Sequence, residues 1–305
     1  MHPQEAELEE GTIAWMRQFG YIASSEDERA ARDARFGTLA ARAYPTGRVE
    51  AIQLASDLMA WLFLTDDANI EEPGAMGLLT QAARHILTTV RLLRDAEALP
   101  EEADQHHFAF QNIVRRLHAL ATPEQTDRFT SGIIEYLMAG CCEAIYLSAQ
   151  RHPEITDYVT LRDSSIATRS VCFIFHELAG SYELPGPTWC RADLQDVVAS
   201  ATRVISNTHD LFSGLRELSR PEAMNLPIVI TSQNGCTVAE AFAIVAEQTD
   251  RETHRFQDLV AGLLATRPGP SVEKYVDGLQ SWIRGNHDWS LTTGRYHVDD
   301  YRTRT

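Results

Sequence analysis

Twelve prolines punctuate this sequence and leave long proline-free segments between them. A proline inside a helix removes a backbone hydrogen bond and clashes with the preceding turn, so prolines mark the ends of helices. Within many of the proline-free segments, apolar residues recur at three- and four-residue spacing, which is typical of helices with one buried face. The sequence therefore predicts an all-α chain of roughly ten helices.

Local signals refine this prediction. Thr122–Gln125 combines an N-cap threonine, a first-turn proline and a capping-box glutamine, and Thr237–Glu240 is a second capping box. The one strand-like run, Pro227–Thr231, is too isolated to build a sheet, and we expect a packed loop there. Because no internal repeat or Gly/Ser linker divides the chain, we expect a single domain over residues 1–305, with a polar tail over residues 298–305.

Acidic residues outnumber basic residues by 43 to 27, and the formal net charge is −16 at pH 7. Nucleic-acid grooves and polybasic membrane anchors both need dense Lys and Arg, so this balance argues against either partner. The acidic N-terminus does not resemble a secretory signal, and no stretch reaches the ~18 apolar residues of a membrane span. Five cysteines without a C-x-x-C pair suit a reducing compartment. We therefore expect a cytoplasmic protein without stable membrane insertion.

Carboxylates end the apolar segment Leu58–Glu72. Helical spacing puts Asp66 on the same face as the apolar and aromatic residues before it, and Asp67 and Glu71 follow directly. Clustered carboxylates repel one another, and a hard divalent cation such as Mg²⁺ relieves that repulsion. The alternative is that these acids only close a helix and face water.

A polar stripe runs along a later predicted helix. His209, Ser213 and Glu217 are four residues apart in turn, so their side chains line one face over two turns, with Arg216 beside them. Imidazole, hydroxyl and carboxylate can together bind a cation, and the guanidinium can hold an anion. The alternative is a solvated helix face.

Together, the two segments resemble the class I terpene cyclases, and the bacterial branch of that family most of all. In that family an acidic motif and an Asn/Ser/Glu triad hold three Mg²⁺ ions, which bind the diphosphate of a prenyl substrate. The resemblance implies that Asp66, Asp67 and Glu71 bind metal in the first motif, although Ile70 stands where many relatives have an acid. It implies the same for Ser213 and Glu217 in the second motif.

Two further segments extend the resemblance. EITDYVTLRDSSIATR is similar to the family stretch in which an arginine recognises the diphosphate, which implies that role for Arg162. GNHDWSLTTGRY is similar to the closing segment whose Arg-Tyr pair grips the diphosphate, here Arg295 and Tyr296. Arg216 would join them as a diphosphate-binding residue. The resemblance covers nearly the whole chain. Four motifs that occur in the family's order are more specific evidence for the family than any one of them alone.

The resemblance implies an α-helical bundle around a deep apolar cavity, and a Mg²⁺-dependent lyase that ionises an acyclic prenyl diphosphate to diphosphate and a carbocation. Farnesyl diphosphate, giving a cyclic sesquiterpene, is the expected substrate. Geranylgeranyl diphosphate (diterpene) and geranyl diphosphate (monoterpene) are the alternatives. A homodimer is compatible with this class. Helix phase, and for Trp289 the match to relatives, predicts the cavity wall at Met59, Leu62, Phe63, Ser165, Ile166, Arg169, Phe173 and Trp289. We expect ordinary core packing for Trp61 and Phe175.

His209 departs from the family, which has Asn or Asp at this position. Imidazole nitrogen is a softer donor than oxygen, and Mg²⁺ prefers oxygen. Three roles are open for His209: it binds a metal, with Mn²⁺ as an alternative ion; it hydrogen-bonds a metal-bound water; or the third metal site is weak.

Three rival functions remain. A chain-elongating prenyl synthase would need a second aspartate-rich motif. A metal phosphohydrolase, suggested by His176, His209-Asp210 and His287-Asp288, would leave the Asp66 and Arg295 segments unexplained. The third rival is a non-catalytic helical partner protein with a degenerate third metal site.

Overall fold

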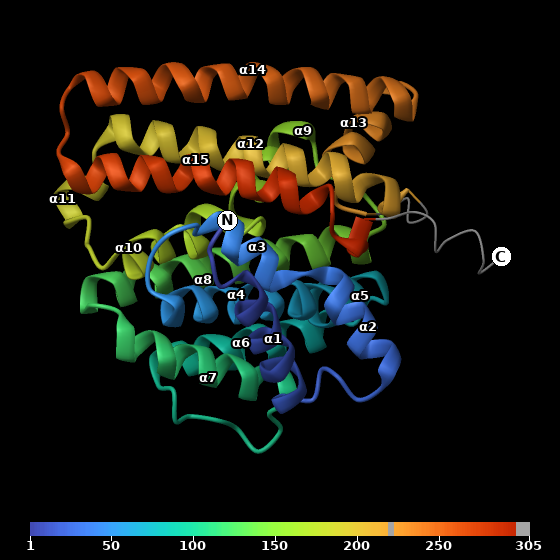
Figure 1. Ribbon diagram of the computed structural model, residues 1–305. Coiled ribbons are helices and arrows are strands. Elements are labelled where there is room, and N and C mark those ends of the chain that lie inside the picture. Colours follow the sequence, from blue (N-terminus) through green and yellow to red (C-terminus); the bar gives the residue numbers. More distant parts are fainter. Residues whose placement is uncertain (219–222, 297–305) are drawn as a thin grey trace.

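The computed structural model describes residues 1–218 and 223–296, and within these ranges the chain forms fifteen α-helices and no strand (Figure 1). The helices are α1 (Glu5–Gln18), α2 (Ser25–Ala34), α3 (Phe36–Ala43), α4 (Val49–Asp66), α5 (Glu72–Ala75), α6 (Leu79–Arg94), α7 (Gln105–Leu120), α8 (Pro123–Ser148), α9 (Ile155–Ser165), α10 (Ile174–Gly180), α11 (Gly186–Trp189), α12 (Ala192–Glu217), α13 (Leu226–Asn234), α14 (Val238–Ala265) and α15 (Pro270–Ser290). Two π-helical segments, η1 (Asp67–Glu71) and η2 (Thr168–Cys172), and a 3₁₀ turn, η3 (Gly294–Tyr296), complete the elements. The predicted all-α class is confirmed, and the predicted tail at 298–305 lies outside the described residues.

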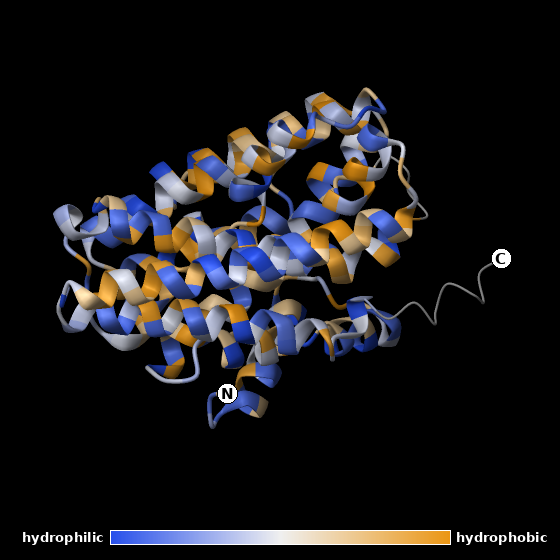
Figure 2. Cartoon of the chain, turned by 90° about the horizontal axis from the view of Figure 1, so that it is seen from above, coloured by the Kyte–Doolittle hydropathy of each residue, from blue (hydrophilic) through white to orange (hydrophobic). Residues whose placement is uncertain are grey.

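The helices are stacked in layers. In Figure 1, α14 forms the outer layer over α12 and α15, and α6 and α7 lie at the opposite side of the molecule. Between these layers, α15 packs on α3, α3 on α4, and α8 on α6 and α9. Hydrophobic and hydrophilic residues interleave along the helices in Figure 2, as expected where each helix buries one face. No helix of the described residues is long and apolar enough to cross a membrane.

Both predicted capping boxes are present. The hydroxyl of Thr122 accepts a hydrogen bond from the backbone N–H of Gln125 at the start of α8, and Thr237 accepts one from Glu240 at the start of α14. The loop predicted at Pro227–Thr231 is wrong, because this run lies in α13. Its proline occupies the first turn, where a missing N–H costs nothing, and the short apolar run buries itself as a helix rather than a loop.

The helices are more numerous than expected because several end without proline. Arg35 separates α2 from α3, Ala167 separates α9 from η2, and Ser181 ends α10, each with a left-handed backbone φ of 52° to 57°. Non-glycine residues adopt this conformation only where the surrounding structure compensates, so no sequence pattern marks these breaks.

The core is built from large side chains on the inner faces. Trp61 and Phe175 are fully buried, as predicted. Trp61 stacks on Phe110 with ring centroids 4.4 Å apart and donates its indole N–H to the carbonyl of His106 at 2.9 Å. This contact ties α4, the helix that ends in Asp66, to the start of α7.

Candidate active site

An apolar cavity lies between α3, α4, α8, α9, α12 and α15. Five of the residues predicted for its wall line it: Met59, Leu62, Phe63, Ser165 and Ile166. Tyr136, Cys172, Ile205 and Trp282 complete much of the apolar lining. The structure places Phe173 and Trp289 behind this lining, where both are buried and Trp289 packs against Phe63 with ring centroids 5.8 Å apart.

The mouth of the cavity gathers both predicted metal motifs. Asp66 and Glu71 come from the end of α4 and from η1, while His209, Ser213 and Glu217 come from α12. Three residues, Asp66, Arg162 and His209, line both the mouth and the cavity, so the polar and apolar spaces are continuous. This mouth is a pocket lined by Asp66, Glu71, Ala75, Glu143, Leu147, Arg162, His209, Asp210, Ser213, Glu217, Ala223 and Met224.

The π-helical turn η1 changes which acids face the mouth. In a π-turn residues five apart share a face, so Glu71 lines the mouth together with Asp66, while Asp67, the residue after Asp66, turns to the C-terminal segment. There its carboxylate lies 3.1 Å from Nη2 of Arg295, whose guanidinium also lies 4.7 Å from the ring centroid of Phe63. The aspartate pair is therefore split between the mouth and an ion pair.

Electrostatic repulsion at the mouth supports a cation site. Burial raises the pKa of Asp66 well above its ordinary value, and the nearby carboxylates of Glu143, Glu71 and Asp67 raise it further. Burial also raises the pKa of Glu143 to about 7, even though the Arg162 guanidinium opposes this. Oxygen ligands crowded in this way are the donor set that a hard divalent cation binds, so the residues fit the metal that the motifs predict.

Arg162, on α9, is anchored by a neighbouring aspartate. Its Nη2 and Nε donate to Oδ1 of Asp210 at 2.8 and 3.1 Å, and Oδ2 of Asp210 accepts from the hydroxyl of Tyr158 at 2.6 Å. Burial alone would raise the pKa of Asp210, but Arg162, His209 and Tyr158 hold it below its ordinary value. A charged carboxylate thus fixes the guanidinium at the boundary of mouth and cavity.

His209 bridges Arg162 and the C-terminal segment. Its Nδ1 lies 3.0 Å from Nη2 of Arg162, and its Nε2 lies 2.8 Å from the hydroxyl oxygen of Tyr296. Burial lowers the pKa of His209, with Arg162 adding to the effect, so the ring is neutral. Arginine only donates hydrogen bonds, so Nδ1 is the acceptor and Nε2 carries the proton toward Tyr296. In this arrangement both nitrogens have protein partners.

The remaining predicted residues differ in position. Ser213 is buried and accepts a hydrogen bond from Nδ2 of Asn225 at 3.1 Å, and Glu217 lines the mouth one turn further along α12. Arg216 lies half-buried in the last turn of α12 and is not among the lining residues of the mouth or cavity. Arg295 and Tyr296 lie in η3, beside the entrance to both.

Sequence reasoning missed Glu143, which lies on α8 and faces the acids of α4 across the mouth. A usable signal was present, because Gly140, Glu143, Ala144 and Leu147 share one buried helix face. This is the same pattern, a carboxylate in an apolar stripe, that pointed to Asp66. The partnership of Asp210 with Arg162 had no such signal, since it joins residues 48 positions apart.

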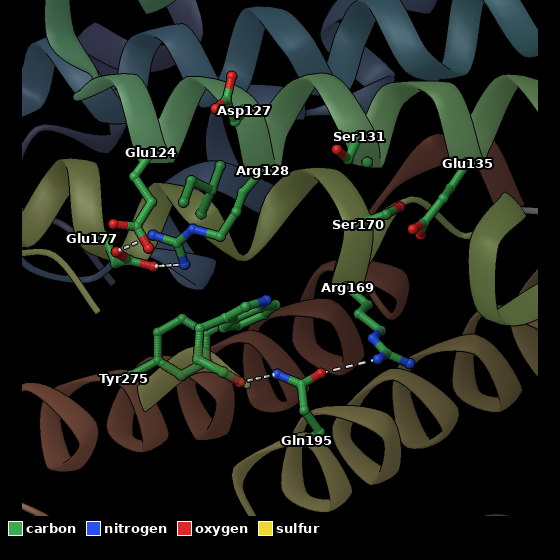
Figure 3. A pocket seen from close by; sticks show the side chains of 13 residues that line it. Glu124, Asp127, Arg128, Ser131, Glu135, Arg169, Ser170, Glu177, Gln195 and Tyr275 are labelled. Atoms are coloured by element: carbon green, nitrogen blue, oxygen red, sulfur yellow. Dashed lines mark hydrogen bonds and ion pairs between the residues drawn. The ribbon is translucent and has the colours of Figure 1, made fainter. Parts of the chain in front are cut away.

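A larger cleft of about 460 Å³ lies elsewhere, between α8, η2, α12 and α15. Figure 3 shows that Arg169, which helix phase had predicted near the substrate cavity, points into this cleft, where it donates to Oε1 of Gln195 at 2.9 Å. The turn at Ala167 and the π-helix η2 cause the difference, because they rotate the chain after α9 away from the phase of that helix. Most of the residues that line the cleft are charged or polar, and none of them lines the mouth.

An all-α bundle with an apolar cavity opening onto clustered acids and an anchored arginine defines a cyclase of the class I terpenoid type. The sequence model of the family described as "Terpene synthase family 2, C-terminal metal binding" matches residues 57–255. The chain belongs to this family and is a terpene synthase, a lyase that uses a divalent metal.

Three known proteins illustrate the similarity. The chain is 30% identical to bonnadiene synthase of Allokutzneria albata, over 97% of this chain and 83% of that protein. It is 31% identical to a (+)-T-muurolol synthase, named as cyclizing (2E,6E)-farnesyl diphosphate, of Roseiflexus castenholzii, over 95% of this chain and 88% of that one. The crystal structure of 2-methylisoborneol synthase from Streptomyces coelicolor A3(2) superposes with a TM-score of 0.81 at 23% identity, covering 95% of this chain and 89% of that chain, which shows the shared fold.

Proposed function

We propose that this terpene synthase uses Mg²⁺ to convert an acyclic prenyl diphosphate, with farnesyl diphosphate favoured, into diphosphate and a cyclic sesquiterpene. The observation that carries the proposal is the continuity of the acidic mouth with the apolar cavity through Asp66, Arg162 and His209. A molecule with an anionic head and a hydrocarbon chain matches that arrangement along its whole length. The farnesyl preference is supported by the name of the T-muurolol synthase.

Asp66, Asp67, Glu71, Ser213 and Glu217 are the proposed metal ligands, for three Mg²⁺ ions in all. Bound Mg²⁺ would neutralise the leaving diphosphate as its charge develops. To bind metal, Asp67 would have to break its ion pair with Arg295. The guanidinium of Arg295 would then be available to bind diphosphate.

Arg162, Arg216, Arg295 and Tyr296 are the proposed diphosphate-binding residues, and Arg162, Arg295 and Tyr296 act on the leaving group. We assign His209 to orienting Arg162 and Tyr296 rather than to direct ligation, because Nδ1 accepts from the arginine and Nε2 carries a proton. The position of His209 in the second motif alone would instead make it a direct metal ligand.

The cavity wall would shape the carbocation and exclude water from it. Met59, Leu62 and Ile166 offer no polar atom to a cation, and the aromatic face of Phe63 can stabilise one by its ring quadrupole. An apolar wall that keeps water away favours internal attack by a double bond over capture by water, which supports a cyclic product.

The test is incubation of the full chain with C10, C15 and C20 prenyl diphosphates and Mg²⁺, followed by gas chromatography–mass spectrometry. We expect a cyclic C15 hydrocarbon or alcohol with farnesyl diphosphate, and its loss on chelation or in Asp66→Asn. Glu135→Gln, which removes an exposed carboxylate in the cleft of Figure 3, is the matched control and should keep full activity. A product from C20 or C10 alone would reassign the substrate, and no product from any of the three would overturn the proposal.

A further inference from the structure

Two histidines and an aspartate meet between α6 and α7, outside the mouth and the cavity. His85 lies in the middle of α6, Asp104 is the N-cap of α7, and His107 lies in the first turn of α7. One ligand atom from each residue lies within 4.8 Å of the other two, and the two imidazole rings are 4.6 Å apart between centroids.

His85 is the unexplained member of this group. Its side chain is buried, with the residue only 4% exposed, yet neither ring nitrogen has a hydrogen-bond partner among the residues that the structure describes. Leaving a polar group buried and unpaired costs about 1–3 kcal/mol. Burial lowers the pKa of His85 to about 3, with His107 adding to the effect, so its ring is neutral and offers a lone pair.

Asp104 and His107 are held in place by a helix cap. Oδ1 of Asp104 accepts from the backbone N–H groups of His106 and His107 and lies 2.7 Å from Nδ1 of His107. The cap accounts for the positions of these two residues but not for His85, whose ring faces them without a partner. The Asp104 side chain is 47% exposed, so one side of the group is open to solvent.

We propose that His85, Asp104 and His107 form a binding site for one divalent transition-metal ion of the Zn²⁺ type, separate from the proposed metal site of the mouth. Two imidazoles and one carboxylate are a typical donor set for such ions, whereas Mg²⁺ prefers oxygen alone. Zn–N and Zn–O bonds of about 2.1 Å put tetrahedral ligands about 3.4 Å apart, so small side-chain rotations would close the group around an ion. The exposed side leaves room for water as the remaining ligand.

The site would act on structure rather than on the reaction. It would cross-link α6 to the start of α7, and that start is joined to α4 through His106. The imidazole Nδ1 of His106 lies 3.3 Å from Oγ1 of Thr65, the residue before Asp66. A metal here is therefore expected to raise the stability of the bundle behind the mouth.

The experiment uses the full chain, stripped with a chelator and returned to a large excess of Mg²⁺ so that oxygen-rich sites are filled. Zn²⁺ binding is measured by calorimetry, Co²⁺ binding by its visible absorption, and melting temperature with and without Zn²⁺. We expect one tight equivalent of either ion in the wild type, with a higher melting temperature and Co²⁺ bands typical of tetrahedral coordination.

Asp104→Asn and His107→Gln should each weaken binding by at least about tenfold and abolish the thermal shift. Asn remains a good N-cap, so Asp104→Asn keeps the start of α7. His118→Gln, an exposed histidine on the same helix, is the matched control and should bind as the wild type does. Equal affinity in all four proteins would locate the ion elsewhere, and no binding in the wild type would remove the site; either result overturns the proposal.

Discussion

Among the described residues, two of the arginine–carboxylate pairs that join helices, Arg128–Glu177 and Arg162–Asp210, have buried carboxylates but are built differently. Arg128 and Glu177 form a two-pronged pair, with Nη1 and Nη2 donating to separate carboxylate oxygens at 2.8 and 2.7 Å, as Figure 3 shows. Arg162 instead directs Nε and Nη2 to a single oxygen of Asp210. Its Nη2 also reaches His209, and its Nη1 lies 3.4 Å from the hydroxyl of Ser165.

The difference separates a structural pair from a functional one. Glu177 is fully buried and also accepts from the backbone N–H of Leu184, so the pair closes on itself and locks α8 to α10. Arg162 keeps donors directed toward the mouth and cavity, while Asp210 is fully used on the protein side by Tyr158 and the backbone N–H of Leu226. An ion pair can present its arginine to a substrate when other protein groups fix the carboxylate partner, as they do for Asp210.

Arg162→Lys should have the largest effect. Lysine keeps the charge but loses the planar fork that contacts Asp210 and the mouth together, so we expect kcat/KM to fall by about 10³-fold, or about 4 kcal/mol. The measurement is steady-state release of diphosphate from farnesyl diphosphate, with urea unfolding in parallel. Unfolding should change little by comparison. If turnover stayed within a few-fold of wild type, Arg162 would belong with Arg128 as a structural residue.

Glu177→Gln should reverse this pattern. Arg128 would then be a buried charge without its partner, and we expect the free energy of unfolding to fall by about 3 kcal/mol. Because the pair lies in the cleft of Figure 3, away from the mouth, kcat/KM per folded molecule should stay near that of the wild type. Denaturant midpoints and active-enzyme titration measure the two quantities. A large loss of kcat/KM with unchanged stability would contradict the distinction between the two pairs.

Sequence patterns predicted more of the site than of the helix ends. Asp66 was singled out because it continues an apolar helix face, and Glu217 because it continues a polar stripe; both line the mouth because helical phase survives folding. The turn at Ala167 could not be predicted, since alanine normally avoids a φ of +57° and only tertiary packing imposes it. This turn and the π-helix η2 that follows it moved Arg169 out of the predicted cavity wall.

Close packing explains why the chain after Ala167 has so little freedom. An added Cβ at Gly132 on α8 would lie 1.5 Å from the carbonyl oxygen of Ser170 in η2, so only glycine permits this approach. The glycine looks unremarkable in the sequence of α8, because its role depends on a segment nearly 40 positions away. Local sequence patterns thus predict which residues share a face of one helix. Contacts between helices determine where such a helix ends and how closely it packs, and these patterns do not show them.

His176, the residue before Glu177, is expected to make the stability of the fold depend on pH. Burial lowers the pKa of His176 to about 3, and its ring is surrounded by Tyr44, Phe173 and Tyr275. In the unfolded chain the imidazole takes up a proton near pH 6.5, whereas in the folded chain it stays neutral down to about pH 3. The unfolded state therefore binds more protons throughout this window, and stability must fall as the pH is lowered through it.

Between pH 7 and pH 5 this single group should cost about 2 kcal/mol of unfolding free energy. Urea unfolding at both pH values, in the presence of a chelator, measures the loss. His176→Gln removes the titrating group, so its loss over the same interval should be smaller by about 2 kcal/mol, whatever its offset at pH 7. His118→Gln, which replaces an exposed histidine on α7, is the control and should keep the full acid sensitivity. If His176→Gln kept it as well, the acid sensitivity would not arise at His176, and His85, whose pKa burial also lowers to about 3, would be the next group to test.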